Sequence, residues 1–226
     1  MRSVRLRQAK MSSDREVLDS LTESTISFDS ERLKKSLDEA LSSNVPLERI
    51  IKEGLGRGME IVGEKYERGQ YFLSDLIMSG VVMNEAIEQL RPLLKSGLSY
   101  SDGNILIGTV EGDLHDIGKN LVKYMLESAG YNVVDLGTDV SPQKFVDKTR
   151  EMKPRMVCLS ALLSVTVPKV KETVDALSKA RLRDNLRILV GGRCLTEEIG
   201  EEAGADAYGK DCMDGLRRAK ELLKHP

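Results

Sequence analysis

The chain changes its hydrophobic period near its middle, and this change limits the folds that are open to it. Between about residues 27 and 94, apolar residues recur at the spacing of an amphipathic helix. From residue 104 onward, short apolar runs alternate with helical segments, and residues 95–103 collect serine, glycine and aspartate with neither period. We therefore predict a helical domain over 27–94, a linker over 95–103 and a second domain over 104–226.

The first half of the chain predicts a small helical bundle. Three or four amphipathic helices are expected within residues 31–43, 46–69 and 71–94. Residues 1–26 are rich in charge and serine and carry no motif, so we expect either a mobile tail or a helix that docks on the bundle.

The second half repeats one unit of strand, loop and helix five times. The predicted strands fall within residues 104–110, 131–137, 155–161, 186–192 and 206–211. Such alternation indicates an α/β domain with a doubly wound, flavodoxin-like parallel sheet and right-handed crossovers. Ligands of these sheets bind beyond the carboxyl ends of the strands, where the strand order reverses. We expect a site at that edge, near His115, Ser160, Gly191 and Gly192.

Composition excludes several classes of function. The formal net charge is −2 and no basic face is clustered, which argues against a nucleic-acid partner. No apolar run reaches membrane-spanning length, and no secretory signal opens the chain. Cys158, Cys194 and Cys212 are widely spaced and form no zinc motif, so we interpret them as reduced thiols of a cytoplasmic protein without a membrane partner.

The stretch EGDLHDIGKN, residues 111–120, holds the only histidine besides His225. A lone loop histidine is usually structural, but Asp113 could accept a hydrogen bond from one ring nitrogen of His115 and leave the other for a metal. Gly112 and Gly118 would allow a bulky group to approach closely. One histidine cannot hold a metal by itself, so the metal would bring its other ligands, as a metal inside a macrocycle does.

Two other kinds of site, a phosphate-binding loop and a phosphoacceptor receiver domain, do not fit this sequence. A phosphate-binding loop needs serine or threonine after its Gly-Lys pair, whereas this chain has Asn120. A phosphoacceptor receiver domain would share the strand count and a lysine near strand five, here Lys210. It needs an aspartate at the end of strand three, where residues 159–161 are Leu-Ser-Ala. Neither alternative has its essential group.

The motifs of the second half resemble those of cobalamin-binding domains. Residues 113–118 match the D-x-H-x-x-G signature, Ser160-Ala-Leu162 matches a second motif, and Gly191-Gly192 matches a third, in the family's order. Residues 58–94 are similar to the cap domain that precedes the cobalamin domain in methionine synthase and in small corrinoid proteins of methyl-transfer systems. The resemblance extends from about residue 27 to the C-terminus.

This resemblance implies a cobalamin, methylcobalamin or a related corrinoid, whose own benzimidazole has left the cobalt. His115 would become the lower axial ligand and the metal-binding residue. Asp113 would orient it and Ser160 would extend the hydrogen-bond chain, so that these three residues couple protonation to cobalt ligation.

The resemblance also implies the remaining contacts with the cofactor. Residues of the first loop would line the lower face, Phe72 of the cap would cover the methyl side, and the other residues would surround the buried nucleotide tail. The chain departs from the family at Arg193-Cys194, where Ala-Pro is common, and at Cys212, where alanine is common. The full set of expected contacts is Phe72, Gly112, Asp113, Leu114, His115, Asp116, Gly118, Ser160, Leu162, Ser164, Thr166, Gly191, Gly192, Asp211 and Cys212.

The function implied is that of a corrinoid protein that carries a methyl group, without catalysing the transfers itself. Its partners would be a substrate methyltransferase, an acceptor methyltransferase that uses a folate or a thiol, and a reductive activation protein. A cobalamin-dependent sensor is the alternative, although the first 26 residues are too short for the DNA-binding module such regulators carry. The small subunit of a cobalamin mutase would not need the cap. Methanol, methylamines, betaines and aryl methyl ethers all remain open as methyl donors.

Overall fold

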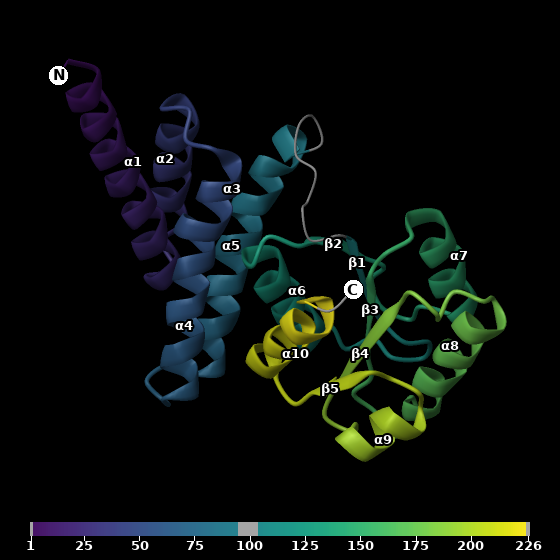
Figure 1. Cartoon of the computed structure of the whole chain (residues 1–226). Coiled ribbons are helices and arrows are strands. Elements are labelled where there is room, and N and C mark those ends of the chain that lie inside the picture. The colour runs from purple at the N-terminus through teal and green to yellow at the C-terminus, as the bar shows by residue number, and fades with distance from the viewer. Residues whose placement is uncertain (1, 95–103, 225–226) are drawn as a thin grey trace. The chain divides into compact units, whose positions relative to one another are not determined.

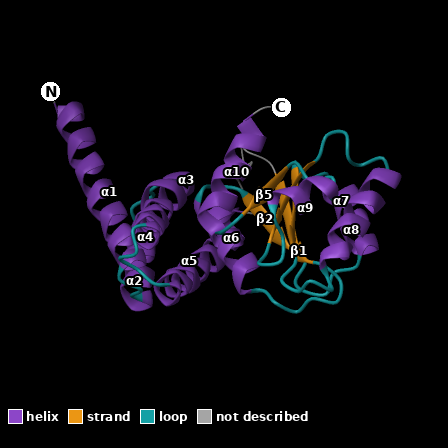
Figure 2. Ribbon diagram, turned by 90° about the horizontal axis from the view of Figure 1, so that it is seen from below, coloured by secondary structure: helices purple, strands orange, loops and turns teal. Residues whose placement is uncertain are grey.

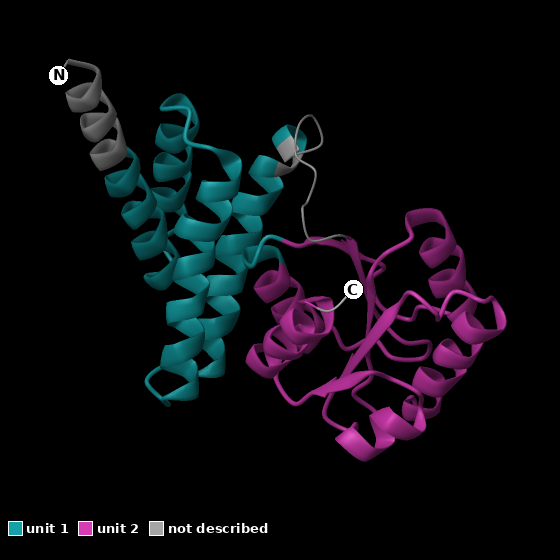
Figure 3. Cartoon of the chain, viewed as in Figure 1, with its two compact units in different colours: residues 1–99, 127–130 teal, residues 100–126, 131–226 magenta. Residues whose placement is uncertain are grey.

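The computed structural model describes residues 2–94 and 104–224. The chain divides into two compact units, which Figure 3 colours separately: residues 1–99 with 127–130, and residues 100–126 with 131–226. The first unit is helical and the second is an α/β sandwich, so the predicted fold class is confirmed.

The first unit is a bundle of long helices (Figure 1). Its elements are α1 (Arg2–Ile26), α2 (Ser30–Ser42), α3 (Leu47–Arg49), the π-helical segment η1 (Ile50–Gly56), α4 (Arg57–Glu67) and α5 (Leu73–Leu94). The backbone stays helical from α3 through η1 into α4, so the predicted helix over 46–69 is one rod with a π-helical segment inside it. Across residues 2–94 and 104–224, no helix combines the length and apolar character that crossing a bilayer requires.

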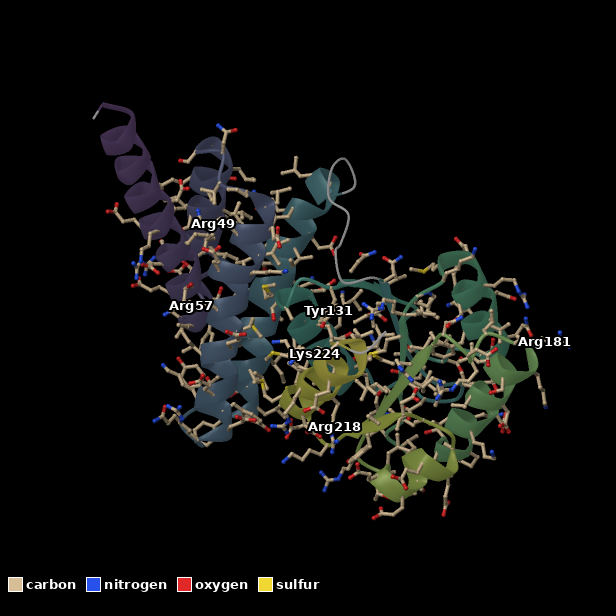
Figure 4. All side chains as sticks on the ribbon, viewed as in Figure 1. Arg49, Arg57, Tyr131, Arg181, Arg218 and Lys224 are labelled. Carbon is tan, nitrogen blue, oxygen red and sulfur yellow. The ribbon has the colours of Figure 1, made fainter. Side chains whose placement is uncertain are left out.

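Helix α1 is part of this bundle. Its side chains Val17, Leu18 and Leu21 are buried, and the Thr22 hydroxyl donates to the carbonyl of Gly54 in η1 at 2.9 Å. Arg49, labelled in Figure 4, pairs with Asp14 of α1 at 3.2 Å. Residues 14–26 therefore pack as a helix within the first unit.

The second unit is a five-stranded parallel sheet with the order β2-β1-β3-β4-β5. Its elements are β1 (Asn104–Thr109), α6 (Ile117–Ser128), β2 (Asn132–Asp135), α7 (Pro142–Met152), β3 (Met156–Ser160), α8 (Val167–Lys179), β4 (Arg187–Gly191), α9 (Glu197–Glu202), β5 (Ala207–Gly209) and α10 (Cys212–Lys224). Helices α6 and α10 cover one face and α7, α8 and α9 cover the other (Figures 1 and 2). This is the flavodoxin-like winding that the sequence predicts.

The central strands are buried on both faces, which explains their continuous apolar runs. Leu106, Val157 and Ile188 lie in the core that β1, β3 and β4 form with α7 and α8, and Phe145 of α7 fills its centre. A side-chain cap starts α7, where the Ser141 hydroxyl accepts the amide of residue 144. The core thus fixes the strands whose carboxyl ends carry the predicted site.

Candidate functional site

The predicted site residues at the ends of β1, β3 and β4 lie at one edge of the sheet because these neighbouring strands end in register. Thr109 of β1 lies opposite Ser160 of β3, and Ser160 lies opposite Gly191 of β4. The loops after these strands therefore start at one edge of the sheet, where the strand order reverses between β1 and β3.

Asp113 lies at the centre of this edge and is completely buried. Its Oδ1 accepts hydrogen bonds from His115 Nδ1 at 2.8 Å and from the His115 amide at 3.0 Å. Its Oδ2 accepts from the Leu162 amide at 2.7 Å, from the Thr166 hydroxyl at 2.9 Å and from the Leu163 amide at 3.3 Å. One carboxylate thus joins the loop after β1 to the loop after β3.

The hydrogen bonds decide the charge of this carboxylate. Burial raises the pKa of the Asp113 carboxyl, but the hydrogen bonds donated by His115, Leu162 and Thr166 lower this pKa by more than burial raises it. The pKa therefore lies well below the usual range. An ionised carboxylate only accepts hydrogen bonds, so the neutral imidazole of His115 must carry its proton on Nδ1. The ring then presents the lone pair of Nε2, the atom that can bind a metal.

The backbone of His115 is fixed on both sides while its ring remains accessible. Its amide bonds to Asp113, and its carbonyl accepts from the Thr109 hydroxyl at 3.0 Å. The side chain is nevertheless 52% exposed. The arrangement is that of a fixed ligand atom presented at an open surface.

Exposed apolar side chains lie on the same two loops and at the start of α6. We call these four residues the apolar rim. Exposed large apolar side chains gathered in one place are typical of binding surfaces, and here they accompany an exposed imidazole. The apolar rim consists of Leu114 (72% exposed), Ile117 (59%), Leu163 (38%) and Val165 (79%).

The hydroxyl that reaches Asp113 belongs to Thr166, whereas sequence analysis assigned this place to Ser160. Ser160 is the last residue of β3, is half-buried, and its carbonyl accepts from the amide of Val110. Thr166 is buried at the N-cap position of α8 and makes no side-chain cap bond there, so its hydroxyl serves Asp113. A threonine directly before α8 was the sequence signal for this contact.

The remaining residues of the first loop shape its backbone. Gly112 has a φ of 79°, a left-handed conformation that few side chains adopt. Asp116 precedes α6, where its carboxylate and carbonyl accept from Asn120. Leu114 belongs to the apolar rim, and Gly118 lies in the exposed first turn of α6.

The glycine pair at the end of β4 lies in close backbone packing. Gly192 has a φ of 134°, and a Cβ on it would lie 1.9 Å from the carbonyl oxygen of Ala161, so no side chain fits there. Gly191 accepts the Ala161 amide at 3.1 Å. These contacts hold the loop after β3 against the end of β4.

The other predicted contacts occupy separate places. Ser164 is exposed in the loop after β3. Asp211 caps α10 by accepting the amide of residue 214 at 2.8 Å, and Cys212 is buried at the first position of that helix. Phe72 belongs to the helical unit, directly before α5, and is 73% exposed.

Both units match families described as B12 binding domains, over residues 103–217 and residues 17–91. The trimethylamine corrinoid protein of Methanosarcina barkeri is 35% identical over 215 residues, which cover 94% of this chain and 99% of that protein. Dimethylamine corrinoid protein 1 of Methanosarcina acetivorans is 36% identical, with 93% and 99% covered.

Solved structures give the same result. A cobalamin-binding protein from Desulfitobacterium hafniense is 33% identical with a TM-score of 0.70, and 91% of this chain and 98% of that chain are covered. A chain of the methanol:cobalamin methyltransferase complex from Methanosarcina barkeri is 26% identical with a TM-score of 0.80, covering 93% and 81%.

Proposed function

This chain belongs to the family of corrinoid proteins with B12 binding domains, and we propose that it carries a methyl group between two methyltransferases on a corrinoid ligated by His115. The observation that carries the proposal is the pair of Asp113 and His115: a buried, ionised carboxylate holds an exposed imidazole with its Nε2 as the acceptor atom.

The residues at the sheet edge fit a large, flat and mostly apolar macrocycle. The apolar rim offers four exposed side chains beside the imidazole, at Leu114, Ile117, Leu163 and Val165. A single protein ligand suffices when the macrocycle supplies the other ligands of its metal. Because His115 takes the lower position, the cofactor's own benzimidazole must be displaced from it.

The residues around His115 then have defined roles. When bound, the corrinoid supplies a cobalt that accepts and releases the methyl group. His115 would hold the cobalt through Nε2, and Asp113 keeps the proton of the ring on Nδ1. Thr166 and the Leu162 amide hold Asp113 in turn, so that they fix the orientation of the ligand.

The other predicted contacts complete the proposal. The displaced nucleotide tail would be held by residues at and after the ends of β3, β4 and β5, namely Ser160, Ser164, Gly191, Gly192, Asp211 and Cys212. Phe72 of the helical unit would shield the bound corrin from water. Its exposed ring in the helical unit is compatible with this task.

The family relationship supports the choice of partners. The relatives' names point to trimethylamine and dimethylamine systems, and one structural relative belongs to a methanol:cobalamin methyltransferase complex. These names support a substrate methyltransferase as the donor. The proposal adds the two partners that a methyl carrier needs: an acceptor methyltransferase that uses a folate or a thiol, and a protein that reactivates oxidised cobalt.

Methyl transfer between purified proteins tests this function. The reconstituted, reduced protein would be mixed with methylamine or methanol methyltransferases and isotopically labelled substrate, and the label followed onto the protein and then onto a thiol or folate after the acceptor enzyme is added. A carrier gains and loses the label stoichiometrically. A protein that binds cobalamin but neither gains label nor releases a preloaded methyl group to any acceptor enzyme would contradict the carrier function and favour the sensor.

A further inference from the structure

The loop after β2 is hydrogen-bonded to the loop that carries His115. The Asp139 amide donates to the carbonyl of Asp113 at 2.9 Å, and the Asp139 Oδ1 accepts from the amide of Gly112 at 2.7 Å. One residue therefore bonds to two consecutive residues of the neighbouring loop. These two residues directly precede the turn that holds the imidazole.

The backbone conformation of Asp139 allows both hydrogen bonds. Its φ is 52°, in the left-handed region, opposite Gly112 with a φ of 79°. Most side chains adopt this conformation at a cost, whereas aspartate and asparagine tolerate it. A carboxylate that accepts a backbone N–H also makes a stronger bond than a neutral oxygen. The residue type at 139 thus suits both the conformation and the contact.

The loop after β2 is itself hydrogen-bonded to β1. The Thr109 amide donates to the carbonyl of Gly137 at 3.0 Å, and the Val140 amide donates to the carbonyl of Thr109 at 3.0 Å. Val110 and Val140 form a parallel bridge. Asp139 therefore stands on a short extension of the sheet, which gives it a fixed position from which to hold the first loop.

We propose that Asp139 is a positioning residue for the axial ligand: it fixes the peptide before Gly112 and the peptide after Asp113 and thereby sets the direction in which the Asp113 carboxylate holds His115. The proposal rests on the proposed ligand function of His115. The effect reaches the imidazole through the backbone of Asp113, because its carbonyl is bonded to Asp139 and its side chain is bonded to the ring. Asp139 need not touch the cofactor for this purpose.

Two substitutions separate the contact from the backbone conformation. Asp139→Gly keeps the left-handed backbone and removes the acceptor for the Gly112 amide, whereas Asp139→Asn keeps both an acceptor oxygen and tolerance of positive φ. Lys153→Gly is the matched control, because Lys153 also has a positive φ, 47°, but ends α7 before β3 begins, at the opposite edge of the sheet.

The first measurement uses the protein without cofactor. Amide hydrogen exchange at Gly112 should be on the order of tenfold faster in Asp139→Gly than in wild type, because the amide has lost its acceptor. Lys153→Gly should exchange at the wild-type rate, and Asp139→Asn should exchange more slowly than Asp139→Gly, because it keeps an acceptor oxygen. Equal rates in all four proteins would contradict the hydrogen bond between the Gly112 amide and Asp139 and overturn the proposal.

The second measurement loads the same four proteins with methylcobalamin and lowers the pH until ligated and unligated forms are both visible in the absorption spectrum. Asp139→Gly should raise the ratio of unligated to histidine-ligated cofactor on the order of tenfold, and Asp139→Asn should raise it less, because it keeps an acceptor oxygen. A histidine-ligated wild type with an unchanged Asp139→Gly ratio would overturn only this proposal. A wild type without histidine ligation would overturn the ligand function as well.

Discussion

The carboxylate of Asp113 is completely buried, yet the imidazole that it holds 2.8 Å away, on His115, is half exposed. The pair thus spans the boundary between the core and the surface. Besides the imidazole, four donors from two loops hold the buried carboxylate, and the imidazole gains a fixed direction without losing access to a ligand.

Asp113 should make the stability of the cofactor-free protein depend on acid. Its folded pKa lies below the unfolded value of about 3.9, so the carboxylate stabilises the fold fully above about pH 5 and this contribution is lost as the pH falls toward the folded pKa. In Asp113→Asn this loss should disappear, and urea midpoints should fall less steeply between pH 5 and 3 than in wild type. Parallel pH profiles of the two proteins would contradict the assignment.

Thr166 should matter more than Ser160 to the carboxylate. Thr166→Val removes the hydroxyl that donates to Asp113 at nearly constant volume, and this should cost about 1–2 kcal/mol in urea unfolding. Thr166→Ser should retain most of the wild-type stability. Ser160→Ala is the comparison, and a larger loss in Ser160→Ala than in Thr166→Val would return the hydrogen-bond chain to Ser160.

Cys158 should be inert although the protein has three thiols. Burial raises the pKa of its thiol to about 12, so almost none of the reactive thiolate forms at pH 8. Brief alkylation of the folded protein followed by peptide mass spectrometry should find modified Cys194, which is partly exposed, and unmodified Cys158. Equal labelling of both would show that β3 opens readily. Denatured protein provides the control in which all three react.

Phe72 should protect the upper face of the bound corrin. Phe72→Ala removes an exposed ring of the helical unit and should speed the photolysis of bound methylcobalamin several-fold, while cobalamin affinity stays close to that of wild type. Leu73→Ala, which truncates the neighbouring half-exposed side chain, serves as control. Identical photolysis rates in wild type and Phe72→Ala would remove Phe72 from the proposal.

Hydrophobic period predicted the architecture because it reports directly on burial. The five apolar runs became β1 to β5, and the segment over 46–69 became one helical rod. The docking of α1 was left open, since its apolar residues Val17, Leu18 and Leu21 stand among charges and serines and give the helix little amphipathic contrast. A residue that α1 contacts, Gly54 of η1, lies 32 residues further along the chain from Thr22, so the local sequence does not show this contact.

The position of the site was predictable, but its hydrogen-bond chain was not. Motif spacing placed Asp113 and His115 two residues apart in one loop, where a contact between them is local. The third hydroxyl depends on how the loop after β3 folds back, which brings Thr166 instead of Ser160 to the carboxylate. Asp139 was missed for a related reason, because its contact with Gly112 spans 27 residues and carries no motif.

The identity of the cobalt ligand tests the central claim most directly. The chain has two histidines, so electron paramagnetic resonance of the reduced cobalt(II) form, with nitrogen-15 in histidine and natural nitrogen in the benzimidazole, can assign the coupling to one residue. Wild type and the control His225→Ala should show nitrogen-15 coupling, and His115→Ala should lose it while it still binds cobalamin through the buried tail. Nitrogen-15 coupling that persists in His115→Ala, or nitrogen-14 coupling from the benzimidazole in wild type, would contradict the account.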